Sequence, residues 1–241
     1  MSVAISVIIP VYRDAAALAR TLAATDFSGA DIVVVATPDE DMGAALRFVP
    51  SGVDIVCVTA TRGRARQMNA GAAVARGQWL VFLHADTRLP CGWTGQIAAA
   101  DRDPRVNAGC FRFALDSPAL FARLIECGVR ARVALLGLPY GDQALFVRRA
   151  SFDALQGYAD LPIMEDVDLV RRLRRGGRLF RSALSAITSA RRWERDGWVA
   201  RTCRHLALIL LYFCGVPPAR LIRLDPGRRA HPVPPPGRMS L

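Results

Sequence analysis

Two acidic sites in this chain have residue types that could carry out transfer chemistry. Asp86 follows the apolar run 79–83 within the string His84-Ala85-Asp86, and Glu165 and Asp166 come much later in the sequence. An apolar run without breaks predicts a strand buried on both faces, and open α/β sheets bind ligands beyond the carboxyl ends of such strands. At that point a hard divalent cation would take oxygen ligands and contact the phosphates of a nucleotide. The second acidic pair could then supply a general base, so the two sites together indicate metal-assisted transfer.

Alternating strand and helix patterns over the first hundred residues predict the framework that positions Asp86. Strands are expected at 4–9, 31–35, 53–58 and 79–83, with Pro10 closing the first of them, and helices at 14–25, 42–48 and 64–76. Gly77 is expected to end the third helix, because glycine is common just beyond a helix C-terminus. Strands separated by helices form parallel, right-handed β-α-β units. The chain is therefore predicted to be an α/β protein with a mostly parallel central sheet flanked by helices.

The second half has a less regular pattern, as expected of a region that faces an acceptor. It predicts a strand at 106–115, a helix at 118–136, and a short strand at 144–147 after the loop 139–143. A further helix is expected to begin near Glu165, where acidic side chains suit the positive end of a helix dipole, and to run to Gly176 and Gly177. Residues 226–241 are rich in proline, glycine and arginine and are predicted to be disordered. Residues 1–225 would then form a single domain.

The positive charge of the chain comes from arginine alone. The formal net charge is +11 at pH 7, and no lysine occurs. Arginine binds phosphate groups through two parallel donors, so nucleotide diphosphates, acidic lipid surfaces and nucleic acid are all partners of suitable charge. A GC-rich coding sequence would explain the same bias, and charge alone does not rank these partners. The arginines lie mostly on predicted helix ends and in the tail without interleaved aromatic residues, which argues against nucleic acid.

Cysteine usage and the N-terminus favour a cytoplasmic protein. The six cysteines are scattered, without a CxxC pair or a histidine at zinc-site spacing, and are expected to be reduced core residues. The first residues lead directly into a strand pattern and lack the features of a signal peptide, so secretion is not expected.

The apolar run 206–216 is shorter than the ~20 residues that a membrane-spanning helix needs. It is expected either to pack on the domain as a C-terminal helix or to lie in an anionic membrane surface as an amphipathic anchor, since arginines flank it at 201, 204, 220 and 223. Peripheral attachment of this kind would suit a lipid-linked acceptor.

Four motifs, in this order, carry a resemblance to a known family. They are SVIIPVY at 6–12, RGRARQMNAG at 62–71, FLHADT at 82–87 and MEDVDL at 164–169. They look like the opening strand, the start of the donor-contacting helix, the DxD motif and the ED catalytic motif of family 2 glycosyltransferases, which have the GT-A fold. In more detail, the chain resembles a bacterial subgroup labelled "transferase 2, radical-SAM/selenodomain-associated", which carries similar HADT, YGDQ and MEDVDL strings. The resemblance covers residues 3–225.

The resemblance implies an inverting, non-processive glycosyltransferase that moves a sugar from a nucleotide-diphosphate sugar to an unidentified acceptor. Asp86 would ligate Mg²⁺ or Mn²⁺ on the diphosphate. Asp166, or less readily Glu165, would take the proton of the acceptor hydroxyl. Arg62 and Arg64 would grip the diphosphate. Donor or cofactor contacts are also implied for Pro10, Tyr12, Asp14, Asn69, His84, Asp142 and Gln143.

Two positions depart from the family pattern. Ala36 stands where the family usually has an aspartate that reads the nucleobase, so selectivity for uridine is expected to be weak unless Asp39 or Asp41 reaches the base. His84 stands where a DxD motif has its first aspartate, which leaves Asp86 as the one sure metal ligand.

The alternative from another class is a catalytically silent nucleotide-binding or scaffold protein with the same fold. On that interpretation Glu165 and Asp166 merely cap their helix, and Asp86 is a turn carboxylate. A nucleotidyltransferase is disfavoured because no glycine-rich phosphate loop opens the chain. The string Arg191-Arg192-Trp193 is similar to part of the QxxRW motif of processive synthases, but the glutamine is missing and processivity is not expected.

Overall fold

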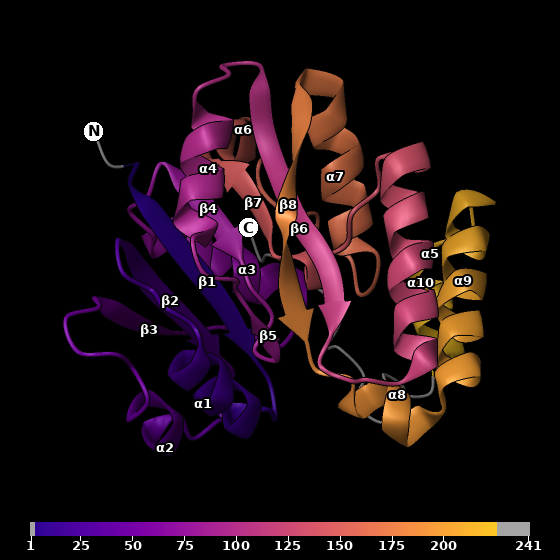
Figure 1. Ribbon diagram of the computed structural model, residues 1–241, viewed down its shortest axis with the longest axis horizontal. Coiled ribbons are helices and arrows are strands. Elements are labelled where there is room, and N and C mark those ends of the chain that lie inside the picture. Colours follow the sequence, from indigo (N-terminus) through magenta and orange to yellow (C-terminus); the bar gives the residue numbers. More distant parts are fainter. Residues whose placement is uncertain (1–2, 226–241) are drawn as a thin grey trace, which may run out of the picture.

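The computed structural model describes residues 3–225, and within them one sheet runs through the molecule (Figure 1). The strand order of this eight-stranded sheet is β3-β2-β1-β4-β7-β6-β8-β5. The strands are β1 (Ile5–Val11), β2 (Ala30–Ala36), β3 (Ile55–Thr59), β4 (Trp79–Phe82), β5 (Thr87–Arg88), β6 (Val106–Leu115), β7 (Leu145–Arg148) and β8 (Arg178–Thr188). The tail 226–241, which the sequence predicts to be disordered, lies outside the described residues.

The first four strands form the parallel half that the alternating pattern predicts. β1 pairs in parallel with β2 and β4, and β2 pairs in parallel with β3. β1, β2 and β4 are buried along most of their length, as continuous apolar runs require when helices cover both faces of a sheet. β3 is the half-exposed edge of this half.

β1 continues through Pro10 to Val11, so the prediction that this proline closes the strand is wrong. The pairing of β1 with β4 ends at Ile8, and beyond that residue β1 keeps β2 as its paired neighbour. Pro10 therefore lies where the strand is paired on one side, and sheets tolerate proline at such positions. The extension carries the chain to Tyr12 and Asp14 at the carboxyl end of the sheet.

The second half of the sheet is mixed. β7 runs antiparallel to β4 and β6, β6 runs parallel to β8, and β5 runs antiparallel to β8. The strand predicted at 106–115 is β6, with the predicted bounds. The sequence pattern does not predict β5 or β8, so this half of the sheet is larger than expected.

Helices cover both faces of the sheet. They are α1 (Ala15–Ala24), α2 (Gly43–Leu46), α3 (Arg64–Val74), α4 (Trp93–Asp101), α5 (Leu120–Leu136), α6 (Arg149–Ala154), α7 (Glu165–Gly176), α8 (Arg191–Asp196), α9 (Trp198–Phe213) and α10 (Pro218–Leu221), with 3-10 turns η1 (Gly141–Gln143) and η2 (Ile222–Leu224). One core joins α1 and α4 to the sheet through Leu18, Leu22 and Ile97. The other core joins α3 and α7 to the opposite face through Met68 and Leu173.

Gly77 does not end α3, which stops at Val74. The Gly77 N–H donates to Ser6 Oγ at 2.7 Å, and a Cβ at position 77 would lie 2.4 Å from the Ser6 backbone nitrogen. Glycine is therefore needed here because the chain passes against β1 before it enters β4, and not because a helix ends.

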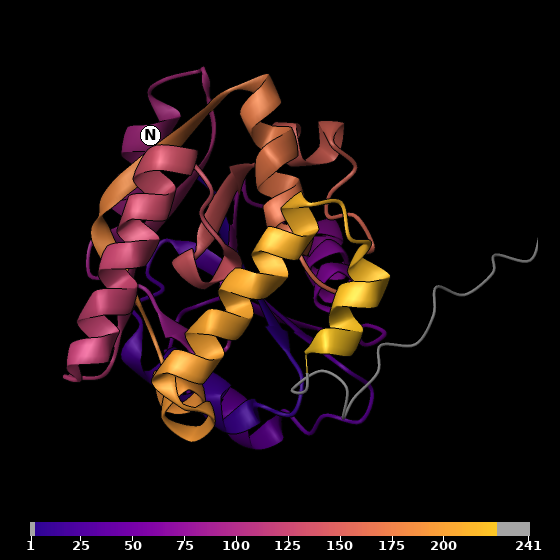
Figure 2. The same ribbon diagram turned by 90° about the vertical axis from the view of Figure 1, so that its right-hand side faces the viewer.

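The C-terminal helices pack beside the sheet and close one side of the molecule (Figure 2). α9 contains most of the predicted apolar run, and its Leu208 is buried against Ile163, Met164 and Val167. The expected packing of this segment on the domain is therefore present. In the described part of the chain, every helix is too short or too polar to cross a membrane.

Candidate active site

A cavity of about 690 Å³ lies at the carboxyl ends of β1 and β4. Its walls come from the start of α3, the turn η1, the start of α7, and helices α8 and α9. Every site residue predicted from the sequence lines this cavity except Asn69 and Gln143. The motifs, although far apart in the sequence, are thus brought together at the sheet edge where open α/β sheets bind ligands.

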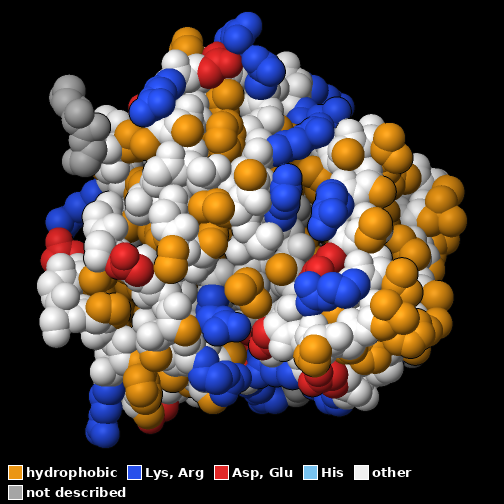
Figure 3. Space-filling view, in the orientation of Figure 1, with side chains coloured by type: hydrophobic (Ala, Val, Ile, Leu, Met, Phe, Trp, Pro, Cys, Tyr) orange, Lys and Arg blue, Asp and Glu red, His pale blue; other side chains and the backbone are white. Residues whose placement is uncertain are grey.

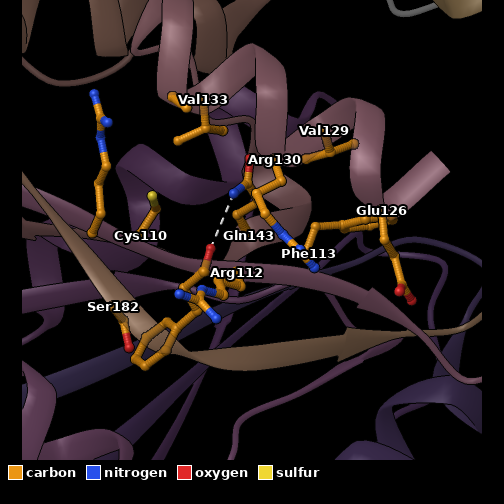
Figure 4. Close-up of a pocket in the computed structure, with 12 residues that line it drawn as sticks. Cys110, Arg112, Phe113, Glu126, Val129, Arg130, Val133, Gln143 and Ser182 are labelled. Carbon is orange, nitrogen blue, oxygen red and sulfur yellow. Dashed lines mark hydrogen bonds between the residues drawn. The ribbon is translucent and has the colours of Figure 1, made fainter. Parts of the chain in front are cut away.

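Asn69 and Gln143 use their side-chain amides elsewhere. The Asn69 amide exchanges two hydrogen bonds with the backbone of Tyr158, at 2.8 and 2.9 Å, and so holds the segment before α7 against α3. The Gln143 amide donates to the carbonyl of Phe111 at 3.0 Å and lines a separate cavity of about 170 Å³ between α5 and strands β6 and β8 (Figure 4). Both amides support the walls of the site rather than facing the large cavity.

Gln67 is a supporting residue that the sequence interpretation missed. It is buried, and its amide donates to the carbonyls of Val11 and Val35 at 2.8 and 2.9 Å. These two bonds join the carboxyl ends of β1 and β2 below the cavity. The sequence places Gln67 inside the RGRARQMNAG motif but does not indicate where its amide points.

Glu165 is buried at the start of α7 and is bound by Arg64. The Glu165 side chain is 1% exposed, and its Oε1 lies 3.1 Å from Arg64 Nη1. Burial opposes the charge of Arg64, but the carboxylates around it, Glu165 first, raise its pKa overall. Arg64 therefore stays charged, and its guanidinium holds Glu165 in place.

Asp166 is held differently from its neighbour. Its Oδ2 accepts a hydrogen bond from the Gly141 N–H at 2.7 Å, and its Oδ1 accepts one from its neighbour Val167 at 2.8 Å. The pKa of Asp166 is raised, chiefly by burial and then by the charge of Glu165, while Arg64 and the two N–H donors oppose the shift. A carboxylate with a raised pKa, fixed by backbone donors in a cavity, has the properties of a general base.

Gly141 brings Asp166 close to the HADT motif. A Cβ at position 141 would lie 2.8 Å from His84 Nε2 and 3.3 Å from Asp166 Oδ2. His84 and Asp166 therefore both lie close to Gly141, and any larger residue there would push one of them away. This close approach is the physical reason for glycine in the YGDQ string.

Asp142 and Tyr140 carry further shifted groups on the same turn. Burial raises the pKa of Asp142 to about 6, which Arg132 opposes and Asp166 reinforces. Burial also raises the pKa of Tyr140 to about 12, and the Arg132 guanidinium carbon lies 3.4 Å from the centre of the Tyr140 ring. Among the described residues, the buried Asp142 Oδ1 has no hydrogen-bond partner. A polar ligand in the cavity could supply one.

Two arginines of α8 lie beside Asp86 in the wall of the cavity. The Asp86 side chain is 7% exposed, and its Oδ2 lies 3.6 Å from Arg191 Nη2 and 3.5 Å from Arg192 Nη2. Arg191 also binds Asp14, and Arg192 Nη2 lies 3.6 Å from Asp14 Oδ2. The sequence interpretation compared these arginines with QxxRW and did not place them in the site. The string Arg191-Arg192-Trp193 was the feature of the sequence that could have pointed to them.

The divalent metal predicted on Asp86 can be tested against these residues. In the region that the structure describes, no group of three or more His, Cys, Asp and Glu side chains could hold a metal ion. Mg²⁺ commonly binds one or two carboxylates together with substrate phosphates and water. Asp86 therefore fits a metal that enters with a diphosphate, once Arg191 and Arg192 turn away from it. The residues do not form a complete site of their own.

Arg62 lies over Tyr12 in the wall of the cavity. The Arg62 guanidinium carbon is 4.3 Å from the centre of the Tyr12 ring, and both residues line the cavity with Pro10. Among the described residues, eight arginines line the cavity that also contains Asp86, and Arg62, Arg64, Arg191 and Arg192 are four of them. Such an arrangement suits a ligand with several negative charges.

Comparisons with known proteins agree with this fold. Crystal structures of S. aureus TarS residues 1–349 have a TM-score of 0.56: the UDP-GlcNAc complex is 15% identical over 77% of this chain and 58% of that chain, and the form without a named ligand is 14% identical over 91% and 68%. This chain therefore spans less than two thirds of the first of these structures. No curated protein sequence matches the chain. The family model "Glycosyl transferase family 2" matches residues 6–127, and the chain belongs to this family.

Proposed function

We propose that the protein transfers a sugar from a nucleoside-diphosphate sugar to an acceptor hydroxyl with inversion at the anomeric carbon, without processive elongation. The observation that carries this proposal is Asp166, a half-buried carboxylate with a raised pKa, in the same cavity as Asp86 and several arginines. Membership of glycosyl transferase family 2 supports it. The complexes of TarS with UDP-GlcNAc and with UDP support a uridine diphosphate sugar as the first donor to test.

The proposed reaction is a single displacement. The carboxylate of Asp166 takes the proton from the acceptor hydroxyl, and the acceptor oxygen attacks the anomeric carbon. The bond from that carbon to the diphosphate oxygen breaks, and the diphosphate leaves from the opposite face. Glu165 is less suited to this role because Arg64 already binds its carboxylate.

The diphosphate would lie between the arginines and Asp86. Asp86 would hold Mg²⁺ or Mn²⁺ that arrives with the donor, and such an ion would neutralise charge on the leaving diphosphate. Arg62 and Arg64 would contact the phosphates. Arg191 and Arg192, which now contact Asp86, would contact the diphosphate in its place. Pro10, Tyr12, Asp14, His84 and Asp142 would complete the donor pocket, with Asn69 and Gln143 as supports.

Finer assignments follow from the sequence motifs. The HADT, YGDQ and MEDVDL strings support membership of the radical-SAM/selenodomain-associated subgroup, and residues 1–225 would act as one catalytic domain in the cytoplasm. The alternative remains a nucleotide-binding protein without turnover. One observation favours that alternative. Asp86, the expected metal ligand, is already paired with Arg191 and Arg192.

A panel of nucleotide sugars tests the proposal. Thermal shift with UDP, GDP, CDP and dTDP sugars and Mn²⁺ identifies the donor, because a ligand of the native state stabilises it by RT ln(1 + [L]/Kd). Release of the nucleoside diphosphate is then measured with the donor that binds. The proposal expects slow donor hydrolysis by the wild type and none by Asp166→Asn. Tight binding with no release from any donor would instead support the silent protein.

A further inference from the structure

Hydrophobic side chains gather on the side of the molecule formed by α5 and α9. Figure 3 shows them at the right-hand edge, where Figure 1 places these two helices, and Figure 2 shows both helices on the side that faces the viewer. The most exposed of them are Leu135 at 84%, Leu120 at 74% and Leu210 at 65%. We call the outward side of the two helices the α5/α9 face. Soluble proteins seldom expose large apolar side chains together unless something binds them.

α5 already has a packed inner side, so its outer leucines do not belong to the core. Ala122 and Val133 are buried on the inner side. On the outer side, Leu120, Leu124 and Leu135 are exposed at helical spacing. A surface helix normally directs polar residues outward. α5 is apolar on both sides, which indicates a second partner for its outer side.

α9 has its polar residues on the side of the cavity. Arg201 and Arg204 line the cavity wall, and Arg201 Nη1 lies 2.6 Å from Asp196. Val199, Leu206 and Leu210 are exposed away from it, at spacings of a helical stripe. The usual orientation of an amphipathic helix is therefore partly reversed, with apolar residues toward solvent.

The charges around the α5/α9 face favour an anionic partner. The acidic residue of α5, Glu126, is buried and bound by Arg123 at 2.8 Å, and the sequence of α9 contains none. Arg130 is exposed at the edge of this face, where it also lines the small cavity between α5 and the sheet, and exposed Arg171 lies with its guanidinium carbon 5.5 Å from the Phe213 ring at the end of α9. A second copy of the chain would bring like charges together on this face. An anionic surface would attract them.

We propose that the α5/α9 face binds the surface of a membrane that contains anionic lipids. Leu120, Leu135, Leu206 and Leu210 enter the layer below the headgroups, and the arginines contact lipid phosphates, as in interfacial amphipathic helices. Membrane binding does not require the sugar transfer proposed above. If that transfer occurs, α9 would lie between the bilayer and the cavity.

Vesicle sedimentation of the full chain tests this inference. The wild type is expected to bind vesicles of phosphatidylcholine and phosphatidylglycerol at least about tenfold more tightly than phosphatidylcholine alone, with weaker binding at high salt. The double variant Leu135→Glu, Leu210→Glu should lose this binding. Phe48→Glu is the matched control, because Phe48 is 53% exposed but follows α2 at the other end of the sheet, and it should bind as the wild type does.

Two results would overturn the inference. They are absence of vesicle binding by the wild type and equal binding by the double variant. If the wild type binds no vesicles and forms a concentration-dependent dimer in ultracentrifugation that the double variant abolishes, the face instead binds a second copy of the chain. Thermal unfolding checks that the exposed substitutions leave the fold intact. Release of nucleoside diphosphate from a soluble donor is measured in parallel. The double variant should lose vesicle binding and keep donor hydrolysis. Vesicle binding therefore tests the membrane proposal, and donor hydrolysis tests the proposed sugar transfer separately.

Discussion

The guanidinium of Arg64 lies 3.1 Å from the carboxylate of Glu165, and this ion pair separates the roles of two adjacent acids. Glu165 pairs with an arginine, whereas Asp166 accepts hydrogen bonds from backbone N–H groups, and both residues line the cavity. The string Glu165-Asp166 alone does not distinguish the two. This difference favours Asp166 over Glu165 as the proposed general base, since Arg64 already pairs with Glu165.

Loss of the Glu165 charge is therefore expected to destabilise the fold. Glu165→Gln leaves Arg64 without its buried partner, and breaking a buried ion pair from one side should cost about 3 kcal/mol of unfolding free energy. Denaturant unfolding measures the loss. Asp168→Asn is the matched control, because Asp168 pairs with Arg172 on the half-exposed side of the same helix and should cost less than about 1 kcal/mol. Equal losses in the two variants would contradict the assignment.

The raised pKa of Asp142 predicts a specific dependence of stability on pH. Its pKa is about 6 in the folded protein and 3.8 as the ordinary value, so the native state binds more protons between these values. Stability from this group is present below pH 3.8 and is lost as pH rises through about 6. Relative to the wild type, Asp142→Asn should gain unfolding free energy over that interval. A difference between the two proteins that does not change from pH 4 to pH 7 would show that Asp142 is not buried in this way.

Metal removal should act through Asp86. A chelator is expected to weaken binding of UDP to the wild type by about tenfold or more, since Asp86 would hold an ion whose charge attracts the diphosphate. Asp86→Ala should bind UDP weakly with or without Mn²⁺, while Asp153→Asn, an exposed acid on α6, should behave as the wild type does. Calorimetric titration measures all three. Chelator-independent binding by the wild type would mean that Arg191 and Arg192 provide the positive charge instead.

Nucleobase selectivity is expected to be weak. Ala36 is buried at the end of β2 and is not part of the cavity lining, so it offers no hydrogen bond to a base. Asp39 follows it, and hydrogen bonds from Thr37 and the backbone, aided by the charges of Arg13 and Arg62, lower its pKa. We expect UDP to be preferred over GDP and CDP by less than about tenfold in calorimetric titration. A larger preference that Asp39→Asn removes would show that Asp39 reads the base.

The parallel half of the sheet could be predicted because its strands are continuous apolar runs. β1, β2 and β4 must be buried on both faces, and that requirement is visible in the sequence. β8 could not be found in this way. It is interrupted by Arg181, Ser182 and Ser185, and its exposure changes irregularly along the strand. Its pairing with β6 and β5, rather than its own pattern, makes it a strand.

The site was predictable where motifs follow strand ends and not where side chains could point in two directions. The position of Asp86 after β4 follows from chain order, but Asn69 and Gln143 could equally have faced the cavity or the backbone. Arg191 and Arg192 lie far from Asp86 in sequence, and only the folded chain brings them to it. The exposure of the outward leucines of α5 could not be predicted either, because periodicity does not reveal which side of a helix is packed when both sides are apolar.

Turnover by Asp166→Asn tests the central claim most directly. Asparagine keeps the shape of the side chain but cannot accept the acceptor proton, so the donor should bind as it does to the wild type while kcat for transfer falls by about 10² to 10⁴. Asp168→Asn, two residues along the same helix, should retain kcat. Donor affinity and transfer are measured on the same three proteins with the donor found in the nucleotide-sugar panel. Loss of turnover with unchanged affinity is the result we expect, and wild-type turnover by Asp166→Asn would contradict the assignment of the base.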